Sequence, residues 1–578
     1  MTRAKPNARH PATHQLQDHP IDGGFSQVEV VVVGAGIAGI LAGVLLPAKV
    51  PGIKLRILER NNDVGGVWLT NIYPGVKSDI PADVYQSTFA PSQHWTCNYP
   101  PGAEIQSYWK GIAERYGVTK HITYNTTVRK AVWCNDRNRW AVHTVTGSDN
   151  HEAVLYADVI ITATGTFSEP EMPNISGMDV YRGRIMHSSL WDPSVDITGK
   201  RLALIGNGAA GLQILPELHN KAAHVDHYIR SPTWISPSFG GEEKLLSQGR
   251  QTVPHEPDEY NQYRKGLESR TYSRFSMLFK DQERSKQATD VLTAYMRRRL
   301  GSNATEDVFA RTLIPSFAPN CRRLTPAPGY LEALKEPNVS LITEPISRFS
   351  DAGVVTSDGT DRACDVIICS TGADVSYRPT FSVLNGKGVD LRQAWSEGFE
   401  PGFPDTYLGM AAAEFPNLFF VTGPNAIGQP GPLVYMIERQ IVYLAKVLRK
   451  MVTQGILTMC PTQAAVDDFR EYCDAYFPLT VMSDACSSWY NGRVPNGRIM
   501  ALWPGSASHA DAARSHVRWE DFEYTYRGAA GNRFGYFGNG WTEKDVEAAA
   551  DPGNVPDFAS YLSASAVMGD LDLSSYLE

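Results

Sequence analysis

The chain has 578 residues, of which 42% are hydrophobic and 20% are charged. This composition is typical of a globular protein with several domains, and it excludes a chain that is mostly disordered. The formal net charge is −8 and no basic block stands out, so we expect no nucleic-acid partner.

The first apolar segment resembles a short membrane span. The run Val30–Leu46 contains only apolar residues and glycine, and it follows a polar arm, 1–25, that we expect to be flexible. The run lies at the lower limit of length for a bilayer span, contains four glycines and stops at Pro47. We therefore expect no membrane span, but a strand, a tight turn and a buried helix.

A dinucleotide-binding turn follows the first strand. Val28–Val33 is rich in valine, as a central parallel strand should be, and it leads directly into Gly34-x-Gly36-x-x-Gly39. The first glycine makes the turn, the second lets a pyrophosphate approach, and the third lets helix and strand pack closely. A second strand, Lys54–Leu58, ends in Glu59, where a carboxylate would meet a ribose.

A second turn of the same kind lies further along the chain. Arg201–Ile205 is an apolar strand, and the glycine turn that follows it opens a helical pattern. The turn consists of Gly206, Gly208 and Gly211, with Ala209 and Ala210 between the last two. The next strand, His224–Ile229, ends in Arg230 and Ser231, which suit the 2′-phosphate of NADP. Two such turns predict two dinucleotides, a bound flavin and a nicotinamide that reduces it.

Three more strands that end near glycine are consistent with this plan. Ala157–Thr162 and Asp365–Cys369 are expected where the chain crosses between the two domains, and Leu418–Val421 is the expected return strand. The fold class is therefore α/β, with two Rossmann-like domains for FAD and NADPH and a helical insertion. The predicted boundaries are 1–25 for the arm, 26–165 for the first part of the FAD-binding domain, 166–374 for the NADPH-binding domain with an insertion at about 242–318, and 375–578 for the return part and C-terminal extension.

Between the two turns lies an aromatic residue followed by Gly, His, Trp and Asp at characteristic spacing: Tyr181, Gly183, His187, Trp191 and Asp192. This motif resembles the fingerprint of class B flavoprotein monooxygenases, and within them the Baeyer–Villiger monooxygenases. Tyr replaces the usual Phe. The resemblance covers roughly Val28 to Thr542. The C-terminal segments Ala501–Gly505 and Arg518–Phe522 resemble filamentous-fungal members that act on polyketide or terpenoid ketones.

Further motifs carry the same resemblance. Gly65–Gly75 resembles the family's flavin loop, Asn320–Arg323 its Cys-Lys-Arg segment and Ser488–Tyr490 its Ser-Trp-Tyr segment. The resemblance implies two sets of cofactor-binding residues. The FAD set is Gly34, Gly36, Gly39, Glu59, Gly66, Val67, Trp68, Asp79, Tyr85 and Val128. The NADP set is Gly206, Gly208, Ala209, Ala210, Gly211, Arg230, Ser231, Arg322, Arg323 and Trp489.

The resemblance also implies a reaction and roles for single residues. NADPH reduces the flavin, oxygen is activated there, and an oxygen atom enters next to a ketone carbonyl to give an ester or lactone. Arg323 is the candidate catalytic cation, with Asp79 as the partner that holds it in place. His187 is expected to couple nucleotide binding to domain closure, and Trp191 to pack. No metal site is expected.

The sequence leaves two alternative activities open, a flavin-dependent N- or S-oxygenase and an NADPH-dependent flavin reductase that inserts no oxygen. The expected partners are a small-molecule ketone and O₂, and the sequence indicates no oligomeric state. The eight cysteines contain no Cys-x-x-Cys pair, so we expect free buried thiols and a cytoplasmic location.

Overall fold

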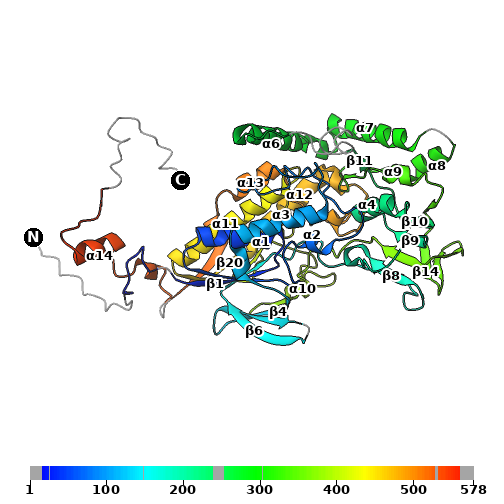
Figure 1. Ribbon diagram of the computed structural model, residues 1–578. Helices are drawn as coiled ribbons and strands as arrows, with labels where there is room; N and C mark the ends of the chain where they lie inside the picture. The colour runs from blue at the N-terminus through cyan, green and yellow to red at the C-terminus, as the bar shows by residue number, and fades with distance from the viewer. Residues whose placement is uncertain are drawn as a thin grey trace, which may run out of the picture.

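The structure is a computed structural model that describes residues 16–24, 26–147, 149–237, 253–301, 304–527 and 531–559. Most of the predicted N-terminal arm, the start of the predicted insertion at 242 and the tail beyond 559 lie outside these ranges. Two parallel sheets, one near the centre and one at the right of Figure 1, organise the described chain, and helices cover their upper side. The fold class predicted from the sequence is the one observed.

The first sheet has the strand order β19-β7-β1-β2-β3, and every neighbouring pair is parallel. Its strands are β1 (Val28–Val33), β2 (Ile53–Leu58), β3 (Ile122–Thr123), β7 (Val159–Thr162) and β19 (Leu418–Phe420). The side chains of β1 alternate between two cores because successive residues of a strand face opposite sides. Val30 and Val32 pack with the helices, whereas Val31 and Val33 pack toward a smaller, four-stranded sheet.

That smaller sheet and three helices form the two outer layers of this part of the molecule (Figure 1). The sheet consists of β4 (Thr126–Cys134), β5 (Arg139–Thr146), β6 (His151–Ala157) and β18 (Ser382–Leu384). The helices are α1 (Ile37–Lys49), α3 (Gly102–Arg115) and α11 (Leu433–Thr453). The apolar run Val30–Leu46 is thus divided between β1, a turn and α1, and within the described residues no helix combines the length and apolarity that a bilayer crossing needs.

The second sheet repeats the parallel arrangement with the order β13-β10-β9-β17-β8. Its strands are β8 (Arg184–His187), β9 (Arg201–Ile205), β10 (His224–Tyr228), β13 (Val339–Ile342) and β17 (Val366–Cys369). Leu202 and Leu204 pack under α4 (Ala209–Leu218) and α9 (Tyr330–Ala333), and Ala203 and Ile205 face the opposite core. That core is completed by β14 (Ile346–Phe349), β15 (Gly353–Thr356) and β16 (Asp361–Ala363).

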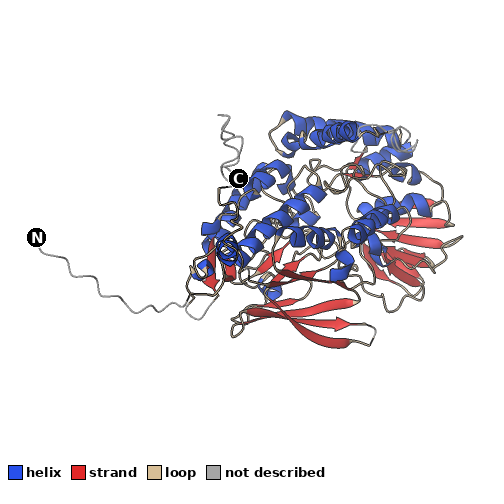
Figure 2. Cartoon of the chain, turned by 60° about the vertical axis from the view of Figure 1, so that its left-hand side comes forward, coloured by secondary structure: helices blue, strands red, loops and turns tan. Residues whose placement is uncertain are grey.

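The remaining elements lie above and beside these sheets (Figures 1 and 2). The segment between the two halves of the second sheet is helical, with α6 (Pro257–Tyr272), α7 (Glu283–Leu300) and α8 (Ala304–Leu313). The short elements and the C-terminal part are α2 (Val67–Thr70), β11 (Ile235–Ser236), β12 (Thr325–Pro326), α10 (Leu391–Ala394), β20 (Ile456–Pro461), α12 (Gln463–Tyr476), α13 (Ala507–Arg514), β21 (Phe522–Tyr526) and α14 (Glu543–Ala550).

One expectation about the cysteines is wrong. Cys321 and Cys486 form a disulfide across 165 residues of sequence, with their Cα atoms 6.3 Å apart. The fold brings them together because the segment before Arg322 packs on the segment before Trp489, where Asp484 accepts a hydrogen bond from the backbone N–H of Ala318 (3.3 Å). Sequence spacing carries no trace of this contact. The other cysteines are free, as expected, but only Cys369 and Cys473 are fully buried, whereas Cys97, Cys134, Cys364 and Cys460 are partly exposed.

Candidate active site

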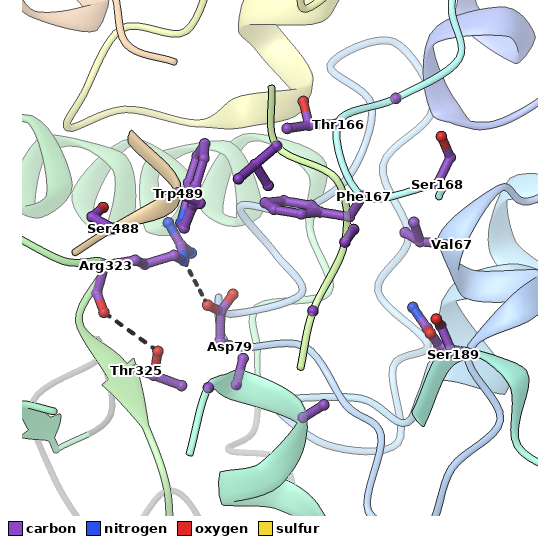
Figure 3. A pocket seen from close by; sticks show the side chains of 18 of the residues that line it. Val67, Asp79, Thr166, Phe167, Ser168, Ser189, Arg323, Thr325, Ser488 and Trp489 are labelled. Carbon is purple, nitrogen blue, oxygen red and sulfur yellow. Dashed lines mark hydrogen bonds and ion pairs between the residues drawn. The ribbon is translucent and has the colours of Figure 1, made fainter. Parts of the chain in front are cut away.

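One cavity of about 2220 Å³ reaches both glycine-rich turns. Its wall combines the ends of β1 and β9 with the two segments that leave the sheets after β7 and β17, the first crossing (163–183) and the second crossing (370–381). Asp79, Arg323 and Trp489 lie on this wall as well. Figure 3 shows Asp79 and Arg323 pointing toward one another, with Trp489 and Phe167 nearby. The fold therefore brings the two predicted cofactor sites and the predicted catalytic pair to one space.

The first turn, together with the start of α1, is shaped to accept a phosphate, and we call it the first cradle. Gly34 has φ +106°, and a Cβ there would lie 2.6 Å from the carbonyl oxygen of Ala163. α1 begins after Gly36 without a side-chain cap, so the N–H groups of its first turn remain available to an anion. A Cβ on Gly39 would lie 1.9 Å from the carbonyl oxygen of Gly34. Gly39 therefore serves close packing and does not line the cavity, whereas Gly34 and Gly36 do.

Glu59 lies buried at the end of β2, beside the turn. Its carboxylate accepts hydrogen bonds from the backbone N–H of Ala35 (2.7 Å) and from the backbone and side chain of Asn61 (2.8 and 2.7 Å). These donors hold the carboxylate at the place where a ribose would follow the pyrophosphate. The residues of this wall fit a flavin dinucleotide.

The other residues predicted for the flavin site line the same cavity: Gly66, Val67, Trp68, Tyr85 and Val128. Gly66 has φ +58°, and a Cβ there would lie 2.9 Å from the Cα of Gly36, so two glycine backbones face each other across a narrow gap. Trp68 Nε1 donates a hydrogen bond to the hydroxyl of Tyr85 (3.2 Å), and burial raises the pKa of Tyr85 to about 12. Tyr85 is therefore a neutral hydrogen-bonding group at neutral pH.

The second turn, together with the start of α4, repeats this construction and forms the second cradle, which has more open space around it. Gly206 has φ +103°, and α4 starts after Gly208 without a side-chain cap. A Cβ on Gly208 would meet nothing within 4 Å, and one on Gly211 would lie 2.1 Å from the carbonyl oxygen of Gly206. Gly206, Gly208, Ala209 and Ala210 line the cavity, whereas Gly211 packs the helix on the strand.

Two arginines meet at the end of β10. Arg322 donates hydrogen bonds to the hydroxyl of Ser231 (2.9 Å) and to the carbonyl oxygen of Pro232 (3.2 Å). Burial and the positive charge of Arg230 lower the pKa of Arg322. Within the part of the chain that the structure describes, neither arginine forms an ion pair with a carboxylate. The cluster of Arg230, Ser231 and Arg322 therefore fits a doubly charged phosphate.

Arg323, the next residue along the chain, lines the same cavity and pairs with Asp79. Its Nε donates to a carboxylate oxygen of Asp79 at 2.8 Å. Burial alone would lower the pKa of Arg323, but the charge and hydrogen bond of Asp79 outweigh it and hold that pKa above its usual value. Because Asp79 accepts from Nε, the terminal nitrogens of the guanidinium remain available as donors. The pair therefore provides a permanent cation on the wall of the cavity.

The fingerprint residues lie around the second sheet, and most have structural contacts. The hydroxyl of Tyr181 donates to the carbonyl oxygen of Cys364 (2.9 Å), and its ring lies against Gly183. Asp192 accepts a hydrogen bond from Arg184 (2.8 Å), and Trp191 packs at the edge of the core. These contacts stabilise the segment that leads into the second cradle.

His187 alone among the fingerprint residues lines the cavity. It is buried at the end of β8, and its Nδ1 accepts a hydrogen bond from the backbone N–H of Ser189 (3.2 Å). Burial lowers the pKa of His187, and the positive charge of Arg493 lowers it further. The ring is therefore neutral at neutral pH.

Several residues of the cavity wall were absent from the sequence prediction. Phe167 contacts Trp489 edge to face, with ring centroids 5.2 Å apart, and Tyr490 donates to the side chain of Gln429 (3.2 Å). Arg493 forms an ion pair with Glu171. Tyr490 lies within the Ser-Trp-Tyr motif and could have been read from it, but Phe167 and Arg493 have no motif of their own. In the described chain, no cluster of His, Cys, Asp and Glu is arranged to hold a metal.

Comparison with known proteins identifies the family. Residues 27–241 match the model of flavin-binding monooxygenase-like proteins. FAD-binding monooxygenase tazF of Aspergillus terreus is 34% identical over 91% of this chain and 94% of its own length. A Baeyer–Villiger monooxygenase of Streptomyces coelicolor is 30% identical over 83% of this chain and 89% of its own.

Solved structures give the same answer. OTEMO in complex with FAD and NADP superposes with a TM-score of 0.72 at 25% identity, over 86% of this chain and 99% of the other. Oxidized steroid monooxygenase bound to NADP superposes with a TM-score of 0.71 at 25% identity, over 87% of this chain and all of the other. Together with the paired cradles and the Arg323–Asp79 contact, these similarities show that the chain belongs to the family of flavin-dependent Baeyer–Villiger monooxygenases.

Proposed function

We propose that this protein uses NADPH and O₂ to insert one oxygen atom next to the carbonyl of a polyketide- or terpenoid-type ketone, giving an ester or a lactone. The observation that carries the proposal is the Arg323–Asp79 pair, joined at 2.8 Å in a cavity shared by both cradles. The second atom of O₂ leaves as water, and NADPH supplies the two electrons.

The chain would hold its two cofactors with different chemistry. The uncapped start of α1, Gly66 and Glu59 would bind the pyrophosphate and ribose of FAD. When bound, the flavin supplies hydride acceptance and the activation of oxygen. The uncapped start of α4 and the cluster of Arg230, Ser231 and Arg322 would bind the pyrophosphate and 2′-phosphate of NADPH.

Arg323 has the central electrostatic role in this proposal. Negative charge develops on oxygen when O₂ is reduced, and a fixed cation stabilises it without reorganisation. Asp79 holds Nε of the guanidinium, so its terminal nitrogens would be available to interact with that charge. Neutral Tyr85, near this ion pair, offers a hydroxyl rather than a second negative charge.

The domain boundaries follow the same division. We propose that 26–165 and 375–578 form the FAD-binding domain and 166–374 the NADPH-binding domain. The helical segment carrying α6 and α7 would cover the cavity, because Thr271, Met277 and Leu278 line it. A cover with apolar side chains excludes water, which strengthens the interactions of Arg323 with charge in the cavity.

The experiment that tests the proposal is Arg323→Ala. Flavin should stay bound, because its cradle lies elsewhere, and NADPH oxidation should remain measurable. Ester or lactone formed per NADPH consumed should fall by about 100- to 1000-fold, with hydrogen peroxide released instead, because one preorganised donor contributes about 2.7–4 kcal/mol.

The matched variant is Asp79→Asn, which keeps the cation but removes the charge that holds it, so its loss of coupling should be smaller. Both variants are assayed with cyclic ketones and with a sulfide. An Arg323→Ala enzyme that couples NADPH to product as well as the unaltered protein would remove Arg323 from the mechanism. Oxidation of the sulfide with no ketone turnover would favour a heteroatom oxygenase.

A further inference from the structure

The two segments that cross between the sheets are bonded to one another. The backbone N–H of Glu171 donates to the carbonyl of Gly372 (2.9 Å), and that of Asp374 donates to the carbonyl of Glu169 (2.8 Å). The hydroxyl of Thr371 also donates to the carbonyl of Glu171 (2.6 Å). The crossings therefore form a two-stranded ribbon that moves as one unit, and any rotation of one parallel sheet against the other must pass through it.

A single guanidinium from a third segment contacts both sides of this ribbon. Arg493 Nη1 contacts a carboxylate oxygen of Glu171 at 2.6 Å, and Nη2 donates to the carbonyl oxygen of Ala373 at 2.9 Å. Glu171 belongs to the first crossing and Ala373 to the second. Because the planar guanidinium presents its donors in a fixed fork, these two bonds set the orientation of Arg493 relative to the ribbon.

The backbone at Arg493 is held in an uncommon conformation. Its φ is +66°, in the left-handed region that residues other than glycine seldom adopt. Two contacts within the segment maintain it: the N–H of Arg493 donates to the carbonyl of Ser488 (2.7 Å), and the hydroxyl of Ser487 donates to the carbonyl of Arg493 (2.9 Å). The segment Ser487–Arg493 is therefore a closed loop, and Trp489 lies inside it.

The loop touches the ribbon at a second point. Trp489 packs edge to face on Phe167, which lies on the first crossing, and Figure 3 shows Trp489 between Phe167 and Arg323. Arg493 and Trp489 thus attach opposite ends of one loop to the same ribbon. Both residues line the cavity, together with Glu171 and Ala373.

We propose that Arg493 is a positioning residue for NADPH. Its contacts with Glu171 and Ala373, which we call the clasp, join the two crossings to the loop of Trp489 and so set the angle between the domains at which the nucleotide binds. The proposal rests on the proposed function, which places NADPH in this cavity, and on the family resemblance, which includes Trp489 among the NADP-binding residues. The contacts of Arg493 with Glu171 and Ala373 involve no residue of the first cradle, so the loss of these contacts should leave flavin binding unchanged.

The test compares NADP⁺ binding by calorimetry in Arg493→Met, Glu171→Gln and the double variant. The ion pair is partly exposed, so each single change should weaken NADP⁺ by about three- to tenfold. The double variant should be little worse than Arg493→Met, because both changes break one contact. The KM for NADPH should rise with little change in kcat, and Arg493→Lys should restore part of the affinity through Glu171.

Hydrogen exchange locates the effect. Without the clasp, backbone amides of residues 165–175 and 487–494 should exchange faster, while flavin content and melting temperature stay at their original values. Arg498→Met is the matched control, because Arg498 makes an ion pair of similar exposure with Asp474 on α12, away from the ribbon (2.8 Å). It should leave NADP⁺ affinity unchanged.

Unchanged NADP⁺ affinity in Arg493→Met would overturn the proposal, as would an equal loss in Arg498→Met or full additivity in the double variant. Calorimetry and exchange need neither ketone nor oxygen. A protein that oxidised no ketone but lost NADP⁺ affinity on clasp removal would contradict the proposed function alone, and a ketone oxygenase with unaltered NADP⁺ affinity would contradict the clasp alone.

Discussion

The two glycine-rich turns of this protein are nearly identical in backbone and opposite in surroundings. Gly34 and Gly206 have φ of +106° and +103°, and a Cβ on either would collide with a carbonyl oxygen of a crossing segment, Ala163 or Ser370, at 2.6 and 2.5 Å. The chain therefore builds the same phosphate cradle twice, each time beside the point where a strand of the same sheet, β7 or β17, leads into a crossing.

The differences lie around the cradles. Gly36 faces the backbone of Gly66 across a narrow gap, whereas Gly208 opens onto free space. The first cradle ends in buried Glu59, and the second in exposed Arg230 next to Arg322. An enclosed site with a carboxylate suits a resident cofactor with free ribose hydroxyls, and an open site with two cations suits a nucleotide phosphate that comes and goes.

Replacing the second glycine of each cradle with valine should have the largest effect on cofactor binding. The two variants should distinguish the flavin site from the NADPH site. Gly36→Val should abolish flavin retention, because its branched side chain fills the gap to Gly66. Gly208→Val should keep the flavin and lose reduction by NADPH. Both glycines have extended backbone that valine can adopt, so both variants should fold.

The measurement is the ratio of flavin to protein absorbance after purification, followed by anaerobic reduction with NADPH. A Gly36→Val protein that keeps its full yellow colour would contradict the assignment of the first cradle. Loss of flavin from both variants would show that the two cradles are not independent.

The cations of the second cradle should give the next largest effect. Arg230→Ala and Arg322→Ala should each raise the KM for NADPH by about tenfold or more, because a charge-assisted hydrogen bond contributes about 1.5–3 kcal/mol. NADH lacks the 2′-phosphate and serves as the internal control, so its KM should change little. Equal use of NADPH and NADH by the unaltered protein would contradict this assignment.

A fall in pH should have the smallest effect, and it should destabilise the second sheet before the first. Burial lowers the pKa of His227 on β10 to about 4, and its Nδ1 donates to the carbonyl of Leu204 (3.2 Å). The ordinary value is 6.5. Between pH 6.5 and 4 the unfolded chain binds a proton that the folded chain does not, so stability falls as pH falls, by at most about 1.4 kcal/mol per unit.

The corresponding strand of the first sheet, β2, has the sequence IKLRIL and carries no histidine. Hydrogen exchange at pH 7.0 and 5.0 should therefore show faster opening of β9 and β10 than of β1 and β2 at the lower pH. His227→Gln should reduce this difference. An unchanged pH dependence in that variant would assign the effect to other groups.

The elements that carry the cradles were predictable because they depend on local chemistry. β-branched runs predict β1 and β9, glycines at fixed spacing predict the turns, and Glu59 or Arg230 at the end of the next strand indicates the nucleotide. The pairing of Arg323 with Asp79 was also predicted, but from the family motifs and not from the distance of 244 residues between them.

The contacts between loops far apart in sequence were not predictable. Cys321 and Cys486, Phe167 and Trp489, and Arg493 and Glu171 lie far apart in sequence and belong to loops without periodicity. Helix and strand signals arise from neighbouring residues and their spacing, so the fold class, both cradles and their difference in charge could be predicted from the sequence. Which loops meet could not, because those contacts form only when the folded chain brings side chains that are distant in sequence within reach of one another.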